Sequence, residues 1–279
     1  MKLIYQIILL SRPLNIFIAI SSVFIMSNLL SDINWINAGL ASLVLFFYMS
    51  AANILNDYID IEADRMNKPH RVLVRNTINP HVIVSIIIFM FLMGSIIANY
   101  LPQTAMKIAW FFALPCILLY EFILKRIPLI GNIVVSLLVG VVFVFASTSL
   151  EAKGYDAYKI MVLAFFLNLI REIIKDIQDM DGDRKSQLLT LPIYVGLQKT
   201  IIIVRSIYLV FFIISLLPMY TQSYGWQYIP LLVFLIHVPL LYITARLNDG
   251  ITQNECEKFS KILKTTIING IIIILISAN

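Results

Sequence analysis

Apolar stretches that are long enough to cross a bilayer recur along the whole chain of 279 residues, and no long polar insertion separates them. A spanning helix needs about 20 predominantly apolar residues. The composition agrees with this pattern, because 60% of the residues are hydrophobic and 13% are charged, against roughly 45–50% and 25% in soluble domains. The sequence therefore predicts an all-α, polytopic membrane protein with a single domain over residues 1–279.

The apolar pattern predicts nine spanning helices. They are expected over residues 14–30, 36–56, 80–100, 103–120, 127–148, 157–177, 199–219, 226–246 and 263–278. The segment before the first helix begins like a signal peptide, but Arg12-Pro13 interrupts its apolar run and no small-residue cleavage site follows. We therefore expect that no segment is removed from the amino terminus.

The distribution of Lys and Arg predicts how the helices are oriented, because basic residues near helix ends are retained on the cytoplasmic side. If the amino terminus is cytoplasmic, all of the 21 basic residues except Lys107, Lys153 and Lys159 lie on the cytoplasmic face. This orientation places the connections 57–79, 121–126, 178–199 and 247–262 inside and the carboxyl terminus outside. The net charge of +5 follows from this bias and fits contact with membrane lipids. No motif indicates a nucleic-acid partner or an obligate protein partner.

The acidic residues gather in two short windows. The first window contains Asp57, Asp60, Glu62 and Asp64, and the second contains Asp176, Asp179, Asp181 and Asp183. Together they hold eight of the 16 acidic residues. Both windows share the frame D-x-x-D-x-x-x-D-R, at an offset of 119 residues from Asp57 to Asp176. Each is expected where a spanning helix leaves the bilayer on the cytoplasmic side, so the two helices are predicted to do equivalent work.

The spacing within each window indicates a metal site. Residues i, i+3 and i+7 of an α-helix lie on one face, so each window is expected to form a stripe of three aspartates. In the first window Asn53 and Asn56 extend this stripe. Mg²⁺ prefers one or two carboxylates together with substrate phosphates, and two such stripes would each hold one ion against a shared diphosphate. The candidate metal ligands are Asn56, Asp60, Asp64, Asp179 and Asp183, with Asp57 and Asp176 as further catalytic candidates.

Other interpretations of these acidic residues remain open. A single acidic turn is commonly only a solvated helix end, whereas two matching windows at the edge of a membrane favour a functional role. A cation-coupled transporter would hold its carboxylates near the bilayer midplane, beside broken helices. A structural membrane protein would need no paired acidic stripes. The expected position at the helix exits favours a site for Mg²⁺ and a diphosphate.

Several motifs resemble those of the UbiA superfamily of intramembrane prenyltransferases. The segments Asn56–Asp64 (N-D-x-x-D-x-x-x-D) and Asn67–Arg71 (N-K-P-x-R) are similar to the first signature, and Asp179–Asp183 (D-x-x-x-D) is similar to the second. Arg12–Asn15 resembles the opening motif of the family, and Leu124–Asn132 resembles the turn between its fourth and fifth helices. The resemblance implies nine helices in two pseudo-symmetric groups, an active site on the cytoplasmic side of the cell membrane, and Mg²⁺ as the cofactor.

Within the superfamily, Arg171–Asp183, with Thr190-Leu191-Pro192 after it, is most similar to the digeranylgeranylglyceryl phosphate synthases. This implies transfer of a geranylgeranyl group from geranylgeranyl diphosphate to the glycerol hydroxyl of geranylgeranylglyceryl phosphate, in ether-lipid synthesis. An aromatic prenyltransferase of quinone or haem O biosynthesis is the alternative within the superfamily. The candidates for binding the diphosphate or the acceptor phosphate are Arg12, Asn15, Asn53, Arg65, Lys68, Arg71, Tyr120, Lys125, Arg126, Arg171, Lys175 and Lys185.

Two segments carry more specific expectations. After Arg71 the chain continues as Val72-Leu73-Val74-Arg75-Asn76-Thr77, where the family commonly has Pro and a small Ser-Gly turn, so the loop over the site is expected to differ in shape. Arg171 is expected to bind the phosphate of the acceptor, helped by Lys175 or Lys185, because arginine captures phosphate through two parallel hydrogen bonds. The alternative for Arg171 is that it anchors its helix or pairs with Glu172.

Overall fold

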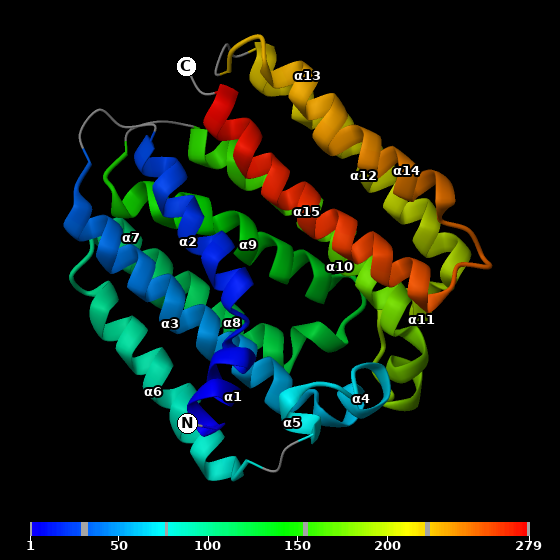
Figure 1. Ribbon diagram of the computed structural model, residues 1–279, viewed down its shortest axis with the longest axis horizontal. Coiled ribbons are helices and arrows are strands. Elements are labelled where there is room, and N and C mark those ends of the chain that lie inside the picture. Colours follow the sequence, from blue (N-terminus) through cyan, green and yellow to red (C-terminus); the bar gives the residue numbers. More distant parts are fainter. Residues whose placement is uncertain (1, 29–32, 76–77, 153–155, 221–223, 278–279) are drawn as a thin grey trace. The chain divides into compact units, whose positions relative to one another are not determined.

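The computed structural model describes residues 2–28, 33–75, 78–152, 156–220 and 224–277. The regular secondary structure of these residues is helical, which confirms the predicted all-α class (Figure 1). By their contacts the residues fall into two compact units. The first consists of the described residues within Met1–Ile123 and Val142–Lys153, and the second of those within Leu124–Val141 and Gly154–Asn279. The single domain over residues 1–279 stays a prediction.

The first unit is organised around one long helix, α3. Its helices are α1 (Lys2–Ser11), α2 (Pro13–Asn28), α3 (Trp35–Ile59), α4 (Ile61–Asn67), α5 (Val72–Arg75), α6 (Pro80–Ala98), α7 (Gln103–Lys107), the π-helical turn η1 (Ile108–Ala113) and α8 (Leu114–Phe122). Helix α3 contacts α1, α2, α6 and α8. The Tyr48 hydroxyl of α3 lies 2.8 Å from the Ser95 hydroxyl of α6. The described core of this unit therefore surrounds the helix that leads into the first acidic window.

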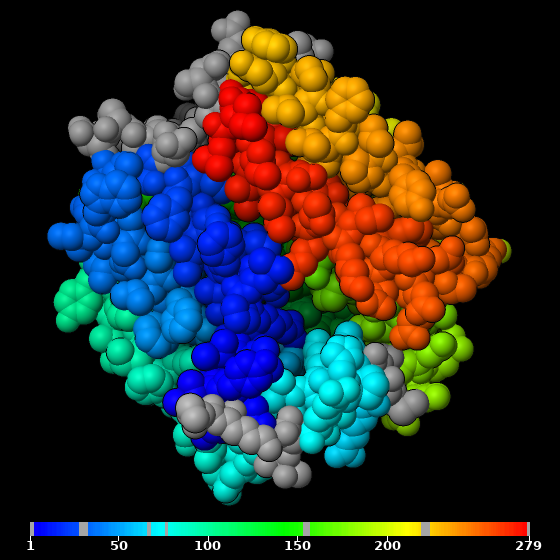
Figure 2. Space-filling model, in the orientation of Figure 1, coloured from blue at the N-terminus to red at the C-terminus, as the bar shows by residue number. Residues whose placement is uncertain are grey.

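The second unit has α10 as its central helix. Its elements are the 3-10 turn η2 (Leu124–Arg126), α10 (Asp156–Lys185), α11 (Leu191–Val195), α12 (Leu197–Tyr220), α13 (Tyr228–Leu232), the π-helical turn η3 (Val233–His237), α14 (Val238–Arg246) and α15 (Gln253–Ser277). Helix α9 (Ile130–Ser149) begins in this unit and ends in the first. Helix α10 contacts α12 and α15, and α15 contacts α13 and α14, with which it forms a continuous surface in Figure 2.

Helices α9 and α10 run antiparallel. The amide of Asn168 in α10 donates to the hydroxyl of Ser136 in α9 at 3.3 Å. Further along, a side chain at Gly140 would lie 2.7 Å from the backbone oxygen of Met161. The glycine thus permits the two backbones to approach closely. These contacts fix the register of α10, the helix that carries the second acidic window.

Most of the predicted spans are confirmed. The predicted count of nine is too high when spans are counted as helices that are long and apolar enough to cross a membrane. Among the described residues seven single helices qualify, or up to eight if the bent pair Leu3–Ser11 and Pro13–Ser27, which meet at 54°, is one span. The span predicted over 157–177 falls in α10, whose Lys159, Arg171 and Glu172 make it more polar than the others. The chain is a multi-pass membrane protein.

Two helix starts differ from the prediction. Arg12 has a positive φ of 55°, so the chain breaks there as expected, but the residues before it form a separate helix, α1. Helix α15 begins at Gln253 and not at 263, so most of the predicted 247–262 connection is helical. The reason is a capping box: the Thr252 backbone N–H donates to the Glu255 carboxylate at 3.0 Å, and the Glu255 N–H donates to the Thr252 hydroxyl at 3.3 Å.

Candidate active site

The first acidic window lies where two helices meet. Helix α3 ends at Ile59 and α4 begins at Ile61, with Asp60 between them at φ −91° and ψ 12°. Helical hydrogen bonds continue across the joint, because Asp60 N–H donates to the Asn56 carbonyl at 3.0 Å and Asp64 N–H donates to the Asp60 carbonyl at 2.8 Å. The spacing predicted one uninterrupted helix over this window. The structure has two helices instead, joined at Asp60.

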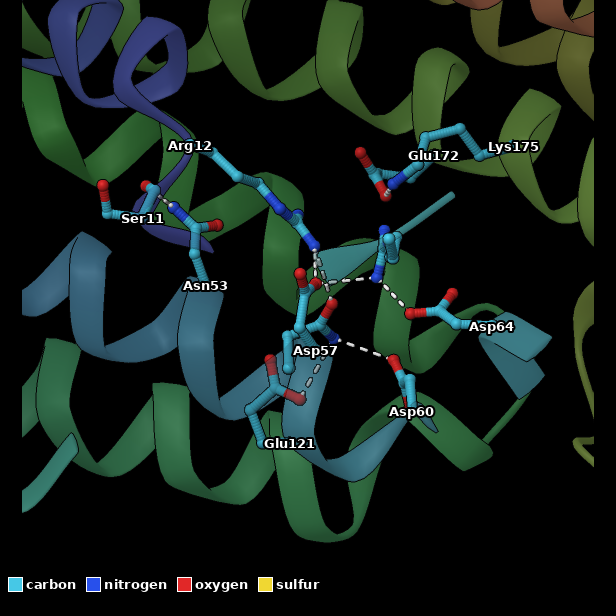
Figure 3. A network of polar contacts seen from close by, with 11 residues as sticks. Ser11, Arg12, Asn53, Asp57, Asp60, Asp64, Glu121, Glu172 and Lys175 are labelled. Atoms are coloured by element: carbon cyan, nitrogen blue, oxygen red, sulfur yellow. Dashed lines mark hydrogen bonds and ion pairs between the residues drawn. The ribbon is translucent and has the colours of Figure 1, made fainter. Parts of the chain in front are cut away.

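Two arginines hold two of the aspartates of this window, and Figure 3 shows Arg12 pointing toward Asp57. Arg71 donates to Asp57 at 2.7 Å and also forms an ion pair with Asp64. Arg12, from the break between α1 and α2, pairs with Asp57 as well. Asp57 and Asp64 are buried, and a buried charge is strongly destabilising unless it is paired. The sequence-predicted residues Arg12, Asp57, Asp64 and Arg71 thus belong to one network within the first unit.

Asn56 connects this network to a buried acid on α8. Its amide nitrogen donates to Asp60 at 3.0 Å and to Glu121 at 3.2 Å, and its amide oxygen accepts from Arg12 at 3.2 Å. Glu121 is only 3% exposed, and sequence reasoning did not select it. A signal was present, since an acidic residue at the end of an apolar span is costly without a role.

Three other candidates of this unit occupy supporting positions. The Asn53 amide donates to the backbone oxygen of Ser11 at 2.9 Å, so it ties α3 to the end of α1. The backbone N–H of Asn15 donates to the carbonyl of Arg12 at 2.9 Å in the first turn of α2. Tyr120 is half-buried and directly precedes Glu121 in α8. A role of these three residues in binding the substrates stays a prediction.

The basic residues near Asp64 differ in exposure. Burial raises the pKa of Asp64, while the positive charges of Arg71 and Lys68 oppose this change. Lys68 is half-buried and Arg65 is exposed. The segment after Arg71 forms the short helix α5, and Asn76 and Thr77 of the predicted divergent loop lie outside the described residues.

The second window lies on α10, which is continuous from Asp156 to Lys185. The window is thus helical throughout, as the spacing predicted. Asp176 accepts a hydrogen bond of 2.8 Å from the amide of Asn132 on α9. Asp183 is buried, Asp179 is half-buried, and Lys185 is exposed at the end of the helix. Within the second unit, Lys125 and Arg126 form part of the η2 turn.

Arg171 and Lys175 share one carboxylate. Glu172 accepts from Arg171 at 2.7 Å and from Lys175 at 2.6 Å. Glu172 is buried, so it needs this neutralisation. The pair between Arg171 and Glu172 is the contact that the alternative interpretation of Arg171 expects. A role of Arg171 in binding a phosphate stays a prediction.

The donor groups of the two windows suit a hard divalent cation, although they do not form a protein-only cage. Among the described residues, no group of three or more His, Cys, Asp or Glu side chains is close enough to hold a metal ion. Mg²⁺ does not require such a group, because it commonly binds one or two carboxylates together with phosphate oxygens and water. The carboxylates of Asp60 and Asp64 and the amide of Asn56 supply oxygen donors of this kind, so the residues fit Mg²⁺ bound together with a diphosphate.

Known proteins are similar to this chain over most of its length. A family model described as the UbiA prenyltransferase family matches residues 15–267. A protein of Methanobrevibacter smithii named digeranylgeranylglyceryl phosphate synthase is 33% identical, over 90% of each chain. The synthase of the same name from Pyrococcus horikoshii is 32% identical, over 85% of this chain and 83% of the relative.

Solved structures share the fold. One described as "Structural and mechanistic insights into the biosynthesis of Digeranylgeranylglyceryl phosphate synthase in membranes" is 26% identical, with a TM-score of 0.79 over 99% of this chain and 98% of that chain. A UbiA homolog from Archaeoglobus fulgidus bound to GPP and Mg²⁺ is 17% identical, with a TM-score of 0.75 over 96% of this chain and 99% of that one.

Proposed function

The chain belongs to the UbiA prenyltransferase family, and on this premise we propose that it is a Mg²⁺-dependent digeranylgeranylglyceryl phosphate synthase. In this function it transfers the geranylgeranyl group of geranylgeranyl diphosphate to the glycerol hydroxyl of geranylgeranylglyceryl phosphate. The observation that carries the site is the partly buried network in which Arg12, Arg71 and Asn56 hold Asp57, Asp60 and Asp64. The choice of acceptor rests on the curated synthases that are similar over most of the chain.

The reaction requires the bond between the allylic carbon and the diphosphate oxygen to break. The diphosphate leaves with the electron pair, the resonance-stabilised allylic cation is captured by the acceptor hydroxyl oxygen, and that hydroxyl loses its proton as the ether bond forms. Mg²⁺, when bound, neutralises the charge that develops on the leaving diphosphate. In this proposal Asn56, Asp60 and Asp64 would hold one Mg²⁺ ion, and Asp179 and Asp183 would hold another.

The protein groups of the first window prepare the site. Arg12 and Arg71 neutralise Asp57 and Asp64, and guanidinium groups in this position are suited to binding diphosphate oxygens as well. The amide of Asn56 orients Asp60 through a hydrogen bond of 3.0 Å. Such fixed groups stabilise developing charge without reorganising during the reaction.

The test is a direct assay of the purified full chain in detergent. With Mg²⁺, geranylgeranyl diphosphate and geranylgeranylglyceryl phosphate, we expect the ether product and pyrophosphate to form in equal amounts. Asp60→Asn and Asp64→Asn should each lower turnover by at least about a hundredfold, while the circular dichroism spectrum stays helical. Glu62→Gln removes an exposed carboxylate of the same window and is the matched control.

The result separates the proposal from its alternatives. If the wild-type chain prenylates 4-hydroxybenzoate or a naphthoate and ignores geranylgeranylglyceryl phosphate, the proposed acceptor is wrong, whereas prenyl transfer stands. If Asp60→Asn and Asp64→Asn retain normal rates across a Mg²⁺ titration, the proposed metal site is wrong. We place this site on the cytoplasmic side of the cell membrane, since the bias of Lys and Arg favours that orientation.

A further inference from the structure

A groove lies between two spanning helices of the second unit, away from both acidic windows in the sequence. Helices α12 and α14, which lie side by side in Figure 1, contact each other. Both lie in candidate membrane spans. The groove between them is shallow and open to the surroundings, with a volume of about 460 Å³. None of the described residues that line it is acidic, so the groove is unsuited to a magnesium–diphosphate complex.

The walls of the groove are apolar and face outward. Leu209 and Phe212 of α12 and Leu241 of α14 line it. Leu209 is 61% exposed and Leu241 is 59% exposed. In a spanning helix such side chains meet lipid, because the hydrocarbon core is the solvent there. The walls therefore suit a hydrocarbon chain.

One end of the groove carries a fixed positive charge. Arg205 donates from Nε to the Thr244 carbonyl at 3.2 Å and from Nη2 to the Leu247 carbonyl at 2.9 Å. These carbonyls lie at the end of α14, where basic side chains commonly satisfy free backbone acceptors. A guanidinium group has five N–H donors in a planar fork. The two contacts therefore fix its position and leave the remaining N–H groups for another acceptor.

Among the described residues, no carboxylate forms an ion pair with Arg205. The other polar groups of the groove are engaged in the helices, since the Thr244 hydroxyl donates to the Leu240 carbonyl at 2.9 Å and the Tyr208 hydroxyl donates to the His237 carbonyl at 3.5 Å. An anion at this end of the groove would complement Arg205 alone.

We propose that this groove binds one anionic phospholipid of the surrounding membrane, with its phosphate on Arg205 and one hydrocarbon chain between α12 and α14. A phosphodiester carries one negative charge and offers two oxygens to the guanidinium fork. The apolar walls distinguish a lipid from a free phosphate ion, which shares only the headgroup chemistry. The site is separate from the proposed active site and does not depend on the proposed reaction.

Native mass spectrometry of the purified full chain in a neutral detergent measures lipid binding and tests this site. Phosphatidylglycerol and phosphatidylcholine with identical acyl chains are titrated separately. We expect phosphatidylglycerol to bind about tenfold more tightly, because the choline ammonium of phosphatidylcholine offsets the negative charge that its phosphate presents to Arg205. Arg205→Gln should lower the affinity for phosphatidylglycerol about tenfold and that for phosphatidylcholine by a smaller factor, because the choline ammonium already offsets the charge of its phosphate.

Two further variants keep the test decisive. Arg246→Gln is the matched control, because Arg246 lies 5.9 Å from the Tyr242 ring and does not line the groove; it should bind both lipids as the wild type does. Ala245→Phe fills the groove while Arg205 is retained, and it should weaken the binding of both lipids. This variant decides the question if Arg205→Gln does not fold.

Several outcomes would overturn the proposal. Equal affinity of the wild type for the two lipids would exclude recognition of the headgroup charge. Equal losses in Arg205→Gln and Arg246→Gln would indicate general attraction to basic residues. Unchanged binding in Ala245→Phe would show that the lipid lies elsewhere. Competition by millimolar inorganic phosphate would show that the site accepts a free anion, against the lipid that we propose.

Discussion

Asn56 uses its amide group to contact three charged partners. Its nitrogen donates to Asp60 and Glu121, and its oxygen accepts from Arg12. An amide that is held on all sides cannot rotate without breaking several hydrogen bonds. Glu121 therefore fixes the direction in which Asn56 presents its donor to Asp60. Groups that orient metal ligands in this way commonly change metal affinity or activity by about 10–100-fold when they are removed.

We predict from this contact that Glu121→Leu raises the Mg²⁺ concentration for half-maximal activity by about tenfold. Glu121→Gln keeps an oxygen that can accept from Asn56, so it should change this concentration by less than about threefold. The measurement is a Mg²⁺ titration of turnover at saturating substrates. A uniform loss of turnover in both variants, with an unchanged Mg²⁺ midpoint, would assign Glu121 a role in folding only.

Arg171 provides a second test at the level of single residues. It shares Glu172 with Lys175, so the three side chains form a cluster with one net positive charge. If Arg171 binds the phosphate of the acceptor, Arg171→Ala should raise the KM for geranylgeranylglyceryl phosphate about tenfold and that for geranylgeranyl diphosphate much less. Arg184→Ala, which removes an exposed cation of the same helix, is the control. Equal changes in both KM values would leave Arg171 as a helix anchor.

At the scale of helices, close approach depends on glycine. A Cβ atom at Gly140 would lie 2.7 Å from the Met161 backbone oxygen on α10, and this backbone atom cannot move aside as a flexible side chain would. We predict that Gly140→Ala lowers the free energy of unfolding by about 1–3 kcal/mol, as overpacking commonly does. Gly39→Ala is the control, because a Cβ atom at Gly39 would have no neighbour within 4 Å. Thermal unfolding of both variants measures the difference, and equal melting temperatures would contradict it.

Helices with strong local signals were predictable from the sequence. Helix α6 begins at Pro80, as expected, because Asn79 caps it by accepting from the His81 N–H at 2.9 Å. Helix α3 begins one residue before its predicted start of 36. The joint at Asp60 was not predictable, since D-x-x-D-x-x-x-D fits a continuous helix equally well. The early start of α15 was signalled by its capping box, but its polar first turns did not resemble a membrane span.

The candidate site was predictable in its residue types and not in its contacts. Asp57, Asp60 and Asp64 were selected by their spacing. The structure pairs Asp57 and Asp64 with arginines and joins Asp60 to them through Asn56. The contact from Asn56 to Glu121 spans 65 residues of sequence, and no local pattern encodes such a distance. The pairing of Arg171 with Glu172 was one of two interpretations that the sequence left open.

For the molecule as a whole, the decisive helix is α10, which by composition alone is too polar to be counted as a span. It has 30 residues, so it is about 45 Å long and exceeds the hydrocarbon thickness of about 30 Å. Its charges have partners within the second unit, because Glu172 pairs with Arg171 and Lys175. Asp176 accepts from Asn132. Charges that are paired inside a bundle are compatible with a spanning helix.

We therefore predict that the two ends of α10 lie on opposite sides of the membrane. In a background without Cys116 and Cys256, Leu189→Cys, after the helix, should react with a membrane-impermeant maleimide only from the cytoplasmic side. Ala152→Cys, before the helix, should react only from outside, and each should react on both sides after permeabilisation. Tyr100 is exposed between α6 and α7. The bias of Lys and Arg predicts that this connection lies outside, so Tyr100→Cys serves as an independent marker. Labelling of Leu189→Cys and Ala152→Cys from the same side would show that α10 does not cross, because a crossing helix must separate its ends by the full bilayer. A reversed pattern at all three positions would leave α10 as a span and overturn the cytoplasmic placement of the aspartates.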